Sequence, residues 1–583
     1  MFDTVLVANR GEIALRVMRA CKELGLRTVA VYSEADRDAP HVAYADDAFL
    51  IGPPAPGQSY LNIERIIEVA QKAGVGAIHP GYGFLSENAS FARACEEAGI
   101  TFVGPLGRTM ERMGAKDAAR REATNAGVPI VPGTLEAVNT PEQVRKLAEE
   151  YGYPVAIKAI GGGGGRGLRV VYTPDEVKDG FDSARRESEA AFKNPELYVE
   201  KYLTNPRHIE IQILADTHGN VVYLGERDCS IQRRHQKLIE ESPSPAITPE
   251  IRTRMGESAV SLAKSVDYRG AGTLEFLFQD GEFYFLEMNT RIQVEHTVTE
   301  MVTNVDLVQG QLRVAQGETL WLTQDQIVPK GHAIECRINA EDPAVGFRPA
   351  LGTIDEYIEP VGFGVRVDSG VRPNYAIPQY YDSLIAKLVV WADTREAAIA
   401  RTLRALEDYR ITGVITTIPF HQMALAHKAF ADGEATVNFI PRYLAEDLPR
   451  LQVSDNHLLA TNHQVPPDVR LFAVEVNGRR FDVRVASTDT DMKKNGDDRP
   501  KRSRSSRLIA PTDGVVCPIQ GTVIAVRVER GQAVEAGQVL FLIEAMKMEN
   551  EITAPHAGVI SEIATEKGQV VEAGALLASY QTE

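Results

Sequence analysis

The first hundred residues alternate between short apolar runs and amphipathic segments. Residues 4–8 form an apolar run that predicts a buried strand, and residues 13–24 carry apolar side chains at helical spacing. A second apolar run at residues 28–32 completes a strand–helix–strand unit, which is typical of a parallel sheet. The connecting residues 9–12 lack the GxGxxG fingerprint of dinucleotide-binding folds. The pattern therefore predicts an α/β fold and leaves its ligand open.

Further changes of pattern divide the rest of the chain. From about residue 114, strands and helices surround a glycine run, and a third α/β segment begins at about residue 331. Residues 472–485 read as a hairpin that turns at Asn477-Gly478, and the polar stretch after them predicts a flexible linker. The predicted segments are 1–113, 114–330, 331–446, 447–486, 487–507 and 508–583.

The last segment contains an internal repeat. GTVIAVRVERGQAVEAGQVLFLI (residues 521–543) aligns with GVISEIATEKGQVVEAGALLASY (residues 558–580), and glycines break the alternating strands in both copies. Two copies of one short β unit predict a small pseudosymmetric sandwich. Residues 544–555 join the copies, so we expect a hairpin there.

Lys547 lies in this hairpin between Met546 and Met548 and resembles the biotinylation site of biotin carboxyl carrier domains. At the tip of a turn its amine can be acylated by a ligase. An isolated Met-Lys-Met is more often a plain surface lysine between two space-filling methionines, but the position inside a duplicated β unit favours the functional interpretation. Lipoyl carriers share this fold; their lysine usually follows Asp, so Met546 favours biotin.

Composition and charge restrict the function further. The net charge of −17 argues against a nucleic-acid partner, which requires a basic face, although a local basic pocket for a small anion remains compatible. The five cysteines form no CxxC pair, which indicates a reducing compartment and neither disulfides nor a zinc site. No signal peptide or membrane-spanning apolar stretch is present, so we expect a cytoplasmic protein without membrane association.

A glycine run at residues 161–167 follows one apolar strand-like segment and precedes another. Successive backbone N–H groups without side chains can close over phosphates. A flexible linker is the alternative, although its position between two strands disfavours it. No Gly-Lys-Ser/Thr follows, so the run is not a Walker A loop.

Two carboxylates and a basic–acidic pair follow downstream. Glu275 and Glu287 lie in apolar strand-like segments, and paired oxygen ligands near phosphates suit Mg²⁺. Salt bridges at the strand ends are the alternative interpretation.

Arg291, Gln293 and Glu295 alternate along the chain, which places them on one face if the segment is extended. A cation beside a carboxylate can bind an anion and remove its proton. By itself, Arg337 would be interpreted as structural.

Together these motifs identify a resemblance. KAIGGGGGRG, EKYL, RHIEIQ, RDCSIQRRHQK, GTLEF, EMNTRIQVEH and ECRINAED resemble an ATP-grasp biotin carboxylase, beginning at VANRGEIALR and HPGYGFLSEN. The resemblance implies an α/β fold with a Rossmann-like N-terminal domain (1–113), an ATP-grasp domain (114–330) and a C-terminal carboxylase domain (331–446). It also implies an all-β biotin carboxyl carrier domain (508–583), and leaves only about residues 447–507 uncovered.

The resemblance implies a role for each matching residue. ATP would be bound by Lys116, Lys158, Gly163, Gly164, Gly165, Glu200, Lys201, Leu203, His208, Gln232, His235 and Leu277. Mg²⁺ or Mn²⁺ would be bound by Glu275, Glu287 and Asn289, and bicarbonate by Lys237, Arg291, Gln293 and Val294. Glu295 would be the general base, and Arg337 would stabilise the biotin enolate. Thr297 replaces the family's usual proline, for which we expect at most a local backbone change.

The resemblance also implies partners. A biotin protein ligase would modify Lys547, and a separate carboxyltransferase β subunit would pass the carboxyl group to an acyl-CoA, as in the acetyl-/propionyl-CoA carboxylase α subunits of actinobacteria that serve fatty acid biosynthesis. Residues 447–486 would be a shortened docking segment for that subunit. The linker 487–507 would span about 25 Å as a coil and about 70 Å when stretched.

Three other functions fit less well. An ATP-grasp ligase joining a carboxylate to an amine does not explain RIQVEH or the C-terminal Met-Lys-Met. In a carrier or scaffold with an inactive N-terminal domain, we would expect Lys237, Arg291 or Glu295 to be replaced. All three residues are present. A single-chain pyruvate carboxylase would need a carboxyltransferase after residue 450, and the remaining length is too short for one.

Overall fold

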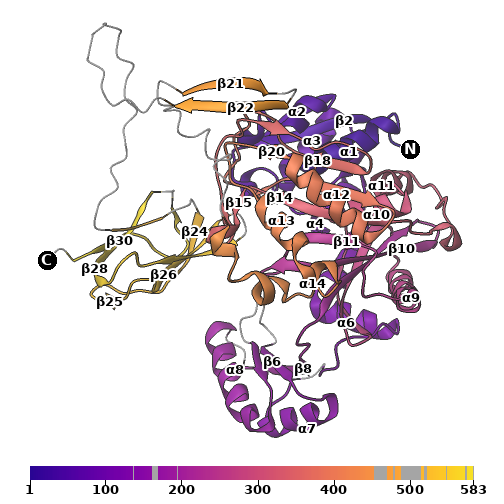
Figure 1. Ribbon diagram of the computed structural model, residues 1–583. Coiled ribbons are helices and arrows are strands. Elements are labelled where there is room, and N and C mark those ends of the chain that lie inside the picture. Colours follow the sequence, from indigo (N-terminus) through magenta and orange to yellow (C-terminus); the bar gives the residue numbers. More distant parts are fainter. Residues whose placement is uncertain are drawn as a thin grey trace, which may run out of the picture.

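Figure 1 shows the computed structural model: a large α/β body, a small lobe projecting from it, and a separate β domain towards the C-terminus. The structure describes residues 1–134, 137–159, 168–192, 195–451, 469–476, 479–486, 514–517, 521–545, 548–571 and 574–581. The predicted glycine run, the linker 487–507 and Lys547 lie outside these residues.

The N-terminal segment folds around a five-stranded parallel sheet in the order β3-β2-β1-β4-β5. The predicted strand–helix–strand unit is confirmed as β1 (Thr4–Val7), α1 (Gly11–Glu23) and β2 (Arg27–Ser33), with β1 and β2 parallel. Gly11 opens α1 with φ of 66°, a conformation that favours glycine. The remaining elements are α2 (Pro40–Tyr44), β3 (Asp47–Gly52), α3 (Ile63–Ala73), β4 (Ala77–His79), α4 (Ala89–Glu97) and β5 (Thr101–Phe102).

The projecting lobe follows two connecting helices, α5 (Gly107–Gly114) and α6 (Lys116–Asn125). Its three-stranded antiparallel sheet has the order β7-β6-β8, and two helices pack against it at the bottom of Figure 1. Its elements are α7 (Pro141–Tyr151), β6 (Val155–Ala159), β7 (Leu168–Val171), α8 (Val177–Phe192) and β8 (Leu197–Lys201). Lys158 and Glu200 come from the paired strands β6 and β8.

An eight-stranded antiparallel sheet forms the centre of the body, in the order β13-β12-β9-β10-β11-β14-β19-β18. Its strands are β9 (Arg207–Ala215), β10 (Val221–Arg233), β11 (Gln236–Ser242), β12 (Gly270–Gln279), β13 (Glu282–Asn289), β14 (His332–Asn339), β18 (Val365–Ser369) and β19 (Leu384–Ala392). Because β11 pairs with β14, the sheet continues across the boundary predicted at residue 330.

Helices and short strands complete the body around this sheet. The helices are α9 (Pro249–Ser265), α10 (His296–Thr303), α11 (Leu307–Ala315), α12 (Arg395–Asp408), α13 (Ile418–Ala426) and α14 (Lys428–Ala431). The short strands pair as β15 (Glu341–Asp342) with β16 (Arg348–Pro349), and β17 (Tyr357–Ile358) with β20 (Arg410–Ile411).

The C-terminal domain is the predicted β sandwich. Its two four-stranded sheets have the orders β23-β30-β28-β25 and β27-β26-β24-β29. The strands are β23 (Gly514–Val516), β24 (Gly521–Val526), β25 (Ala533–Val534), β26 (Val539–Ala545), β27 (Met548–Thr553), β28 (Gly558–Ile563), β29 (Val570–Val571) and β30 (Leu576–Tyr580). Ala545 pairs with Met548, so the hairpin expected between the repeats is confirmed on both sides of Met546 and Lys547.

A separate hairpin lies between the body and the sandwich in sequence. Strands β21 (Val469–Val476) and β22 (Arg479–Ala486) are antiparallel, and Val476 pairs with Arg479. This pairing confirms the hairpin that the sequence predicted over 472–485. The turn residues Asn477 and Gly478 lie outside the described residues, and the docking role of the hairpin stays a prediction.

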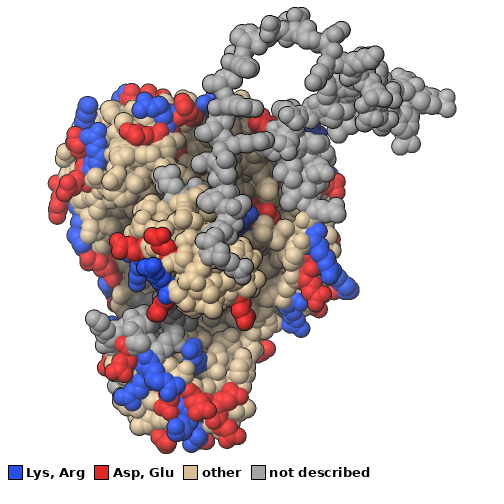
Figure 2. Space-filling model, turned by 90° about the vertical axis from the view of Figure 1, so that its left-hand side faces the viewer, with Lys and Arg blue, Asp and Glu red and all other residues tan. Residues whose placement is uncertain are grey.

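The surface shown in Figure 2 mixes acidic and basic side chains, and no large area of one sign stands out among the described residues on that face. Within the described part of the chain, no helix combines the length and the apolar character needed to cross a bilayer.

Candidate active site

A cavity of about 1450 Å³ lies where the N-terminal sheet, the lobe and the central sheet meet. Its lining includes every predicted site residue whose side chain the structure describes: Lys158, Glu200, Lys201, Leu203, His208, Gln232, His235, Lys237, Glu275, Leu277, Glu287, Asn289, Arg291, Gln293, Val294, Glu295 and Arg337. Asn9 of the first predicted segment and Thr522 of the last also line it, so residues from four of the predicted segments line one space. Lys116 begins α6, but its side chain is not described; Gly163, Gly164, Gly165 and Lys547 lie outside the described residues.

Lys237, on β11, is at the centre of the charged part of this cavity. Its Nζ lies 3.0 Å from an oxygen of Glu275 and 2.8 Å from one of Glu295, and it also pairs with Glu210. Burial alone would lower the pKa of Lys237, but the three carboxylates raise it well above its usual value. Lys237 is therefore a permanent cation in a largely buried pocket, as a site for a small anion requires.

Glu295 lies between two cations. Arg337 Nη2 is 2.9 Å from the second oxygen of Glu295 and 2.5 Å from Glu240. Burial would raise the pKa of Glu295, but Lys237 and Arg337 outweigh it, so the pKa is lowered and the carboxylate is ionised at neutral pH. Burial raises the pKa of Glu240 to about 7, although Arg337 opposes this. Glu295 thus satisfies the first condition for a general base, which is to be unprotonated.

The segment before Glu295 is not extended. Residues 291–294 form a loop, and Glu295 is the N-cap of α10, so the condition for placing Arg291, Gln293 and Glu295 on one face is not met. Gln293 and Glu295 both reach the Lys237 cluster, with Gln293 Nε2 donating to Glu275 at 2.8 Å. Arg291 instead contacts Glu87 of the N-terminal domain at 3.0 Å and Asn289 at 2.6 Å. The loop therefore divides these side chains between two parts of the cavity wall.

The two predicted metal-binding carboxylates lie on neighbouring strands, where Glu275 of β12 and Glu287 of β13 are direct partners. Glu275 is buried, and Asn289 donates to it at 3.2 Å. Burial opposes its ionisation, but Lys237 and His208 lower its pKa strongly. His208 Nε2 lies 2.9 Å from Glu275. Glu275 therefore also forms the kind of salt bridge that the sequence left open as an alternative to metal binding. The oxygen donors suit a divalent cation, which would compete with these nitrogen groups.

The opposite part of the cavity joins the lobe to the body. Lys158 and Glu200 form an ion pair there, and Arg120 Nη1 lies 3.1 Å from the same carboxylate. Leu203 and Leu277 add apolar surface beside these charges. Charged groups next to a small apolar wall are what a nucleotide requires.

Sequence reasoning missed two residues at the heart of the site, Glu210 and Arg227. Arg227 is fully buried and donates to Glu210 at 3.2 Å and to Gln212 at 2.7 Å, while Glu210 also pairs with Lys237. The sequence does show charged residues within the apolar strands β9 and β10, and a buried charge requires a partner. It does not show which residue the partner is.

Glu341 provides a pH-dependent prediction at the edge of the cavity. Burial raises its pKa to about 7, and one of its oxygens accepts hydrogen bonds from Ser383 and Asn339. Stability linked to this group is present below the unfolded pKa near 4.5 and is lost as the pH rises through about 7. The amide oxygen of Glu341→Gln can accept the same hydrogen bonds and does not titrate. The free energy of unfolding of this variant, relative to that of wild type, should therefore increase by about 2–3 kcal/mol between pH 5 and pH 8. Thermal unfolding of both chains across this range measures the difference; a constant difference would contradict the assignment.

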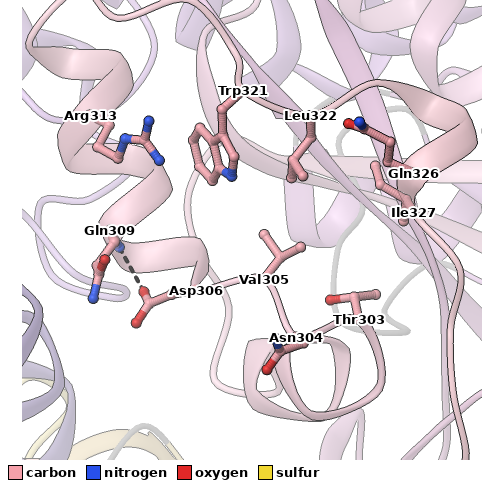
Figure 3. A pocket seen from close by; sticks show the side chains of 10 residues that line it. All are labelled: Thr303, Asn304, Val305, Asp306, Gln309, Arg313, Trp321, Leu322, Gln326 and Ile327. Atoms are coloured by element: carbon pink, nitrogen blue, oxygen red, sulfur yellow. Dashed lines mark hydrogen bonds between the residues drawn. The ribbon is translucent and has the colours of Figure 1, made fainter.

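A second, smaller cavity of about 240 Å³ lies between α10, α11 and the segment after α11 (Figure 3). The indole of Trp321 stacks with Arg313, whose guanidinium carbon lies 3.9 Å from the ring centroid. Asp306 accepts a hydrogen bond from the backbone of Gln309 and so caps α11. These contacts give Arg313 and Asp306 structural roles.

Four family models match the chain. They are biotin carboxylase, N-terminal domain (residues 1–110); carbamoyl-phosphate synthase L chain, ATP binding domain (115–323); biotin carboxylase C-terminal domain (335–442); and biotin-requiring enzyme (510–579). Two relatives each match over 76% of this chain. A pyruvate carboxylase subunit of Methanothermobacter thermautotrophicus is 56% identical and covered over 90% of its length, and biotin carboxylase 1 of Bacillus subtilis is 55% identical and covered over 99%.

A solved structure supports the same relationship. The biotin carboxylase domain dimer of 2-oxoglutarate carboxylase from Hydrogenobacter thermophilus, in complex with MgADP, ADP and bicarbonate, is 52% identical to this chain. The match covers 76% of this chain and 97% of that one, with a TM-score of 0.69. The chain therefore belongs to the biotin carboxylase family, and it joins an ATP-dependent carboxylase to a carrier domain of the biotin-requiring enzymes.

Proposed function

We propose that the chain uses ATP to carboxylate biotin attached to Lys547, with bicarbonate as the carboxyl source, and that a separate carboxyltransferase passes the carboxyl group to an acyl-CoA. The observation that carries the carboxylation step is the ionised Glu295 between Lys237 and Arg337 in a cavity beside the Glu275–Glu287 strand pair. One small space thus holds a base, two cations and oxygen ligands for a metal.

Bicarbonate is a poor nucleophile at neutral pH. Lys237 supplies positive charge for the anion, and Glu295 is placed to remove its proton, so that the anion can attack the γ-phosphate of ATP. An incoming anion would also compete for the cations that now lower the pKa of Glu295, and this would make the carboxylate a stronger base. The attack releases ADP and forms carboxyphosphate, which breaks down to CO₂ and phosphate.

The phosphoryl transfer requires neutralisation of negative charge. Glu275, Glu287 and Asn289 would hold Mg²⁺, which would supply positive charge to the phosphates when bound. Lys158 pairs with Glu200 in this structure and lies on the lobe, so it can approach a nucleotide from that side. We assign nucleotide binding to this side of the cavity because it offers both a cation and the apolar surface of Leu203 and Leu277.

Arg337 is assigned to the biotin end of the reaction. Biotin would supply the ureido nitrogen that accepts the carboxyl group. The phosphate released with CO₂ would take the proton from that nitrogen, and negative charge would develop on the ureido oxygen. Arg337 carries a fixed charge because burial, which would lower its pKa, is outweighed by Glu240 and Glu295. Tyr82 and Tyr381 line the same cavity and provide aromatic surface for an apolar ring system.

Arg337→Ala is expected to lower the rate of biotin carboxylation by about 10²–10³-fold, the effect of removing one donor to a developing oxyanion. The measurement is ATP hydrolysis with free biotin, in the presence and absence of bicarbonate. A rate within threefold of wild type would refute the role. Arg254→Ala is a matched control, since this arginine forms an exposed ion pair with Glu282 at 3.6 Å and should leave the rate unchanged.

The carrier domain lies close enough to contribute to the cavity wall. Thr522 of β24 and Glu544 of β26 line the cavity together with the carboxylase residues, and these two residues are strand partners. Glu544 precedes Lys547 by three positions. This placement supports delivery of biotin from the chain's own carrier domain to its own carboxylase site.

The carboxyl acceptor is the part of the proposal that the relatives leave open. One relative is named as part of a pyruvate carboxylase and another as the small subunit of 2-oxoglutarate carboxylase, so a 2-oxo acid is the second candidate. We favour an acyl-CoA because the fused carboxylase–carrier arrangement resembles actinobacterial α subunits. The test combines the biotinylated chain with a carboxyltransferase of each type and measures bicarbonate fixation into acetyl-CoA, propionyl-CoA or pyruvate. Transfer to pyruvate alone would overturn the acyl-CoA assignment.

A further inference from the structure

The loop that leads to Glu295 is fixed by a lysine from a distant strand. Lys387, on β19, donates from Nζ to the backbone carbonyl of Val294 at 2.8 Å. Its side chain is completely buried. The acceptor belongs to the peptide group that joins Val294 to Glu295, so the hydrogen bond fixes the orientation of the peptide from which the general base extends.

Lys387 is itself anchored from two other directions. Its Nζ lies 3.2 Å from Glu12 at the start of α1 and 3.9 Å from Asp368 on β18. Glu12 also accepts a hydrogen bond from the hydroxyl of Tyr82. Burial would lower the pKa of Lys387, but the surrounding carboxylates raise it, so its charge is permanent. One ammonium group thus connects the N-terminal domain, the central sheet and the loop before Glu295.

Ion pairs hold the C-terminal half of the helix that follows Glu295. Glu300, in α10, lies 2.8 Å from Arg16 of α1 and 2.8 Å from Arg366 of β18. Helix α10 therefore has basic partners from two other segments at its C-terminal half and Lys387 at its N-terminal end. A rigidly held helix is a good support for a catalytic group at its cap, because such groups act only within a narrow range of positions.

We propose that Lys387 is a positioning residue for the carboxylation reaction: it orients the Val294–Glu295 peptide, and with it the Glu295 carboxylate, without touching the substrates. This inference rests on the proposed role of Glu295. It assigns to Lys387 an effect on the rate of the chemical step and none on nucleotide binding, since its ammonium group contacts Val294, Glu12 and Asp368, which all lie in the body rather than in the lobe.

Lys387→Met tests the inference. The thioether side chain fills similar space but cannot donate to the Val294 carbonyl. With saturating bicarbonate and free biotin, we expect kcat of bicarbonate-dependent ATP hydrolysis to fall about tenfold to hundredfold, as a small misplacement of a catalytic group does. The KM for ATP should stay within twofold of wild type. Unchanged kcat, or a parallel change in the KM for ATP, would overturn the inference.

Two further variants separate positioning from general loss of stability. Lys387→Met leaves Glu12 without a cation, whereas Asp368 keeps Arg366 at 2.8 Å. The double variant Lys387→Met/Glu12→Gln removes the charge of Glu12 and tests the same lost hydrogen bond if the single variant does not fold. Arg395→Met is the matched control, because it breaks a buried pair with Glu241 at 2.7 Å elsewhere in the body. We expect Arg395→Met to lower Tm but to keep kcat within twofold of wild type.

The outcomes also distinguish this inference from the proposed function. A wild-type chain without bicarbonate-dependent ATP hydrolysis would refute the function itself. An active wild type, together with a folded Lys387 variant of normal kcat, would refute only the positioning role. A loss of kcat in Arg395→Met equal to that in the Lys387 variant would assign both effects to stability and would also refute it.

Discussion

Replacing Glu295 by Gln is expected to lower the rate of bicarbonate-dependent ATP hydrolysis by about 10²–10⁴-fold, the usual contribution of a positioned general base. Gln keeps the size of the side chain but cannot accept a proton. The fold should tolerate the change, because Lys237 retains Glu210 and Glu275 as partners and Arg337 retains Glu240. The lost activity would therefore report on proton removal.

The measurement is phosphate release with and without bicarbonate, using free biotin as acceptor, at enzyme concentrations that make a rate slower by about 10⁴-fold visible. Glu282→Gln provides the control, since Glu282 is an exposed residue of β13 paired with Arg254. It should behave as wild type. If Glu295→Gln retained more than one fifth of the wild-type rate, another group would have to remove the proton.

Lys547→Arg should abolish carboxylation of the chain's own carrier completely. Arginine keeps the positive charge but has no primary amine that a biotin ligase can acylate. After incubation with a biotin protein ligase, biotin and ATP, intact-mass measurement should show a biotin-sized increase for wild type and none for the variant. Hydrolysis of ATP in the variant should require free biotin to reach the wild-type rate.

Lys567→Arg controls for the position of the lysine, because Lys567 is exposed in the second copy of the repeat. That variant should be biotinylated like wild type. A wild-type chain that stays unmodified would remove the carrier assignment while leaving the carboxylase site intact. A chain that is biotinylated at Lys547 but hydrolyses ATP independently of bicarbonate would remove the carboxylase assignment and leave the carrier assignment intact.

Local pattern was sufficient for much of the fold. The alternation of apolar runs and amphipathic segments predicted β1, α1 and β2, and the turn signal Asn477-Gly478 predicted the β21–β22 hairpin. The repeat predicted the sandwich and the hairpin between its halves. These features depend on neighbours in sequence, since a side chain's position within a helix or strand fixes the face that it occupies. The resemblance added the residues of the cavity, which motifs in the right order identify well.

The sequence by itself therefore determined the α/β fold of the carboxylase, the β sandwich, and many of the residues that line the cavity, but not Glu210 or Arg227. Only the tertiary structure decided how those residues are paired. Arg337 contacts Glu240 across 97 positions, and Lys387 reaches Val294 across 93. Residues 291–295 would place alternate side chains on one face if they were extended, but they form a loop. Contacts with Lys387 and the Lys237 cluster, which come from distant parts of the chain, override the local alternation. Buried charges must find partners wherever the packed chain brings them, and no short-range pattern encodes that choice.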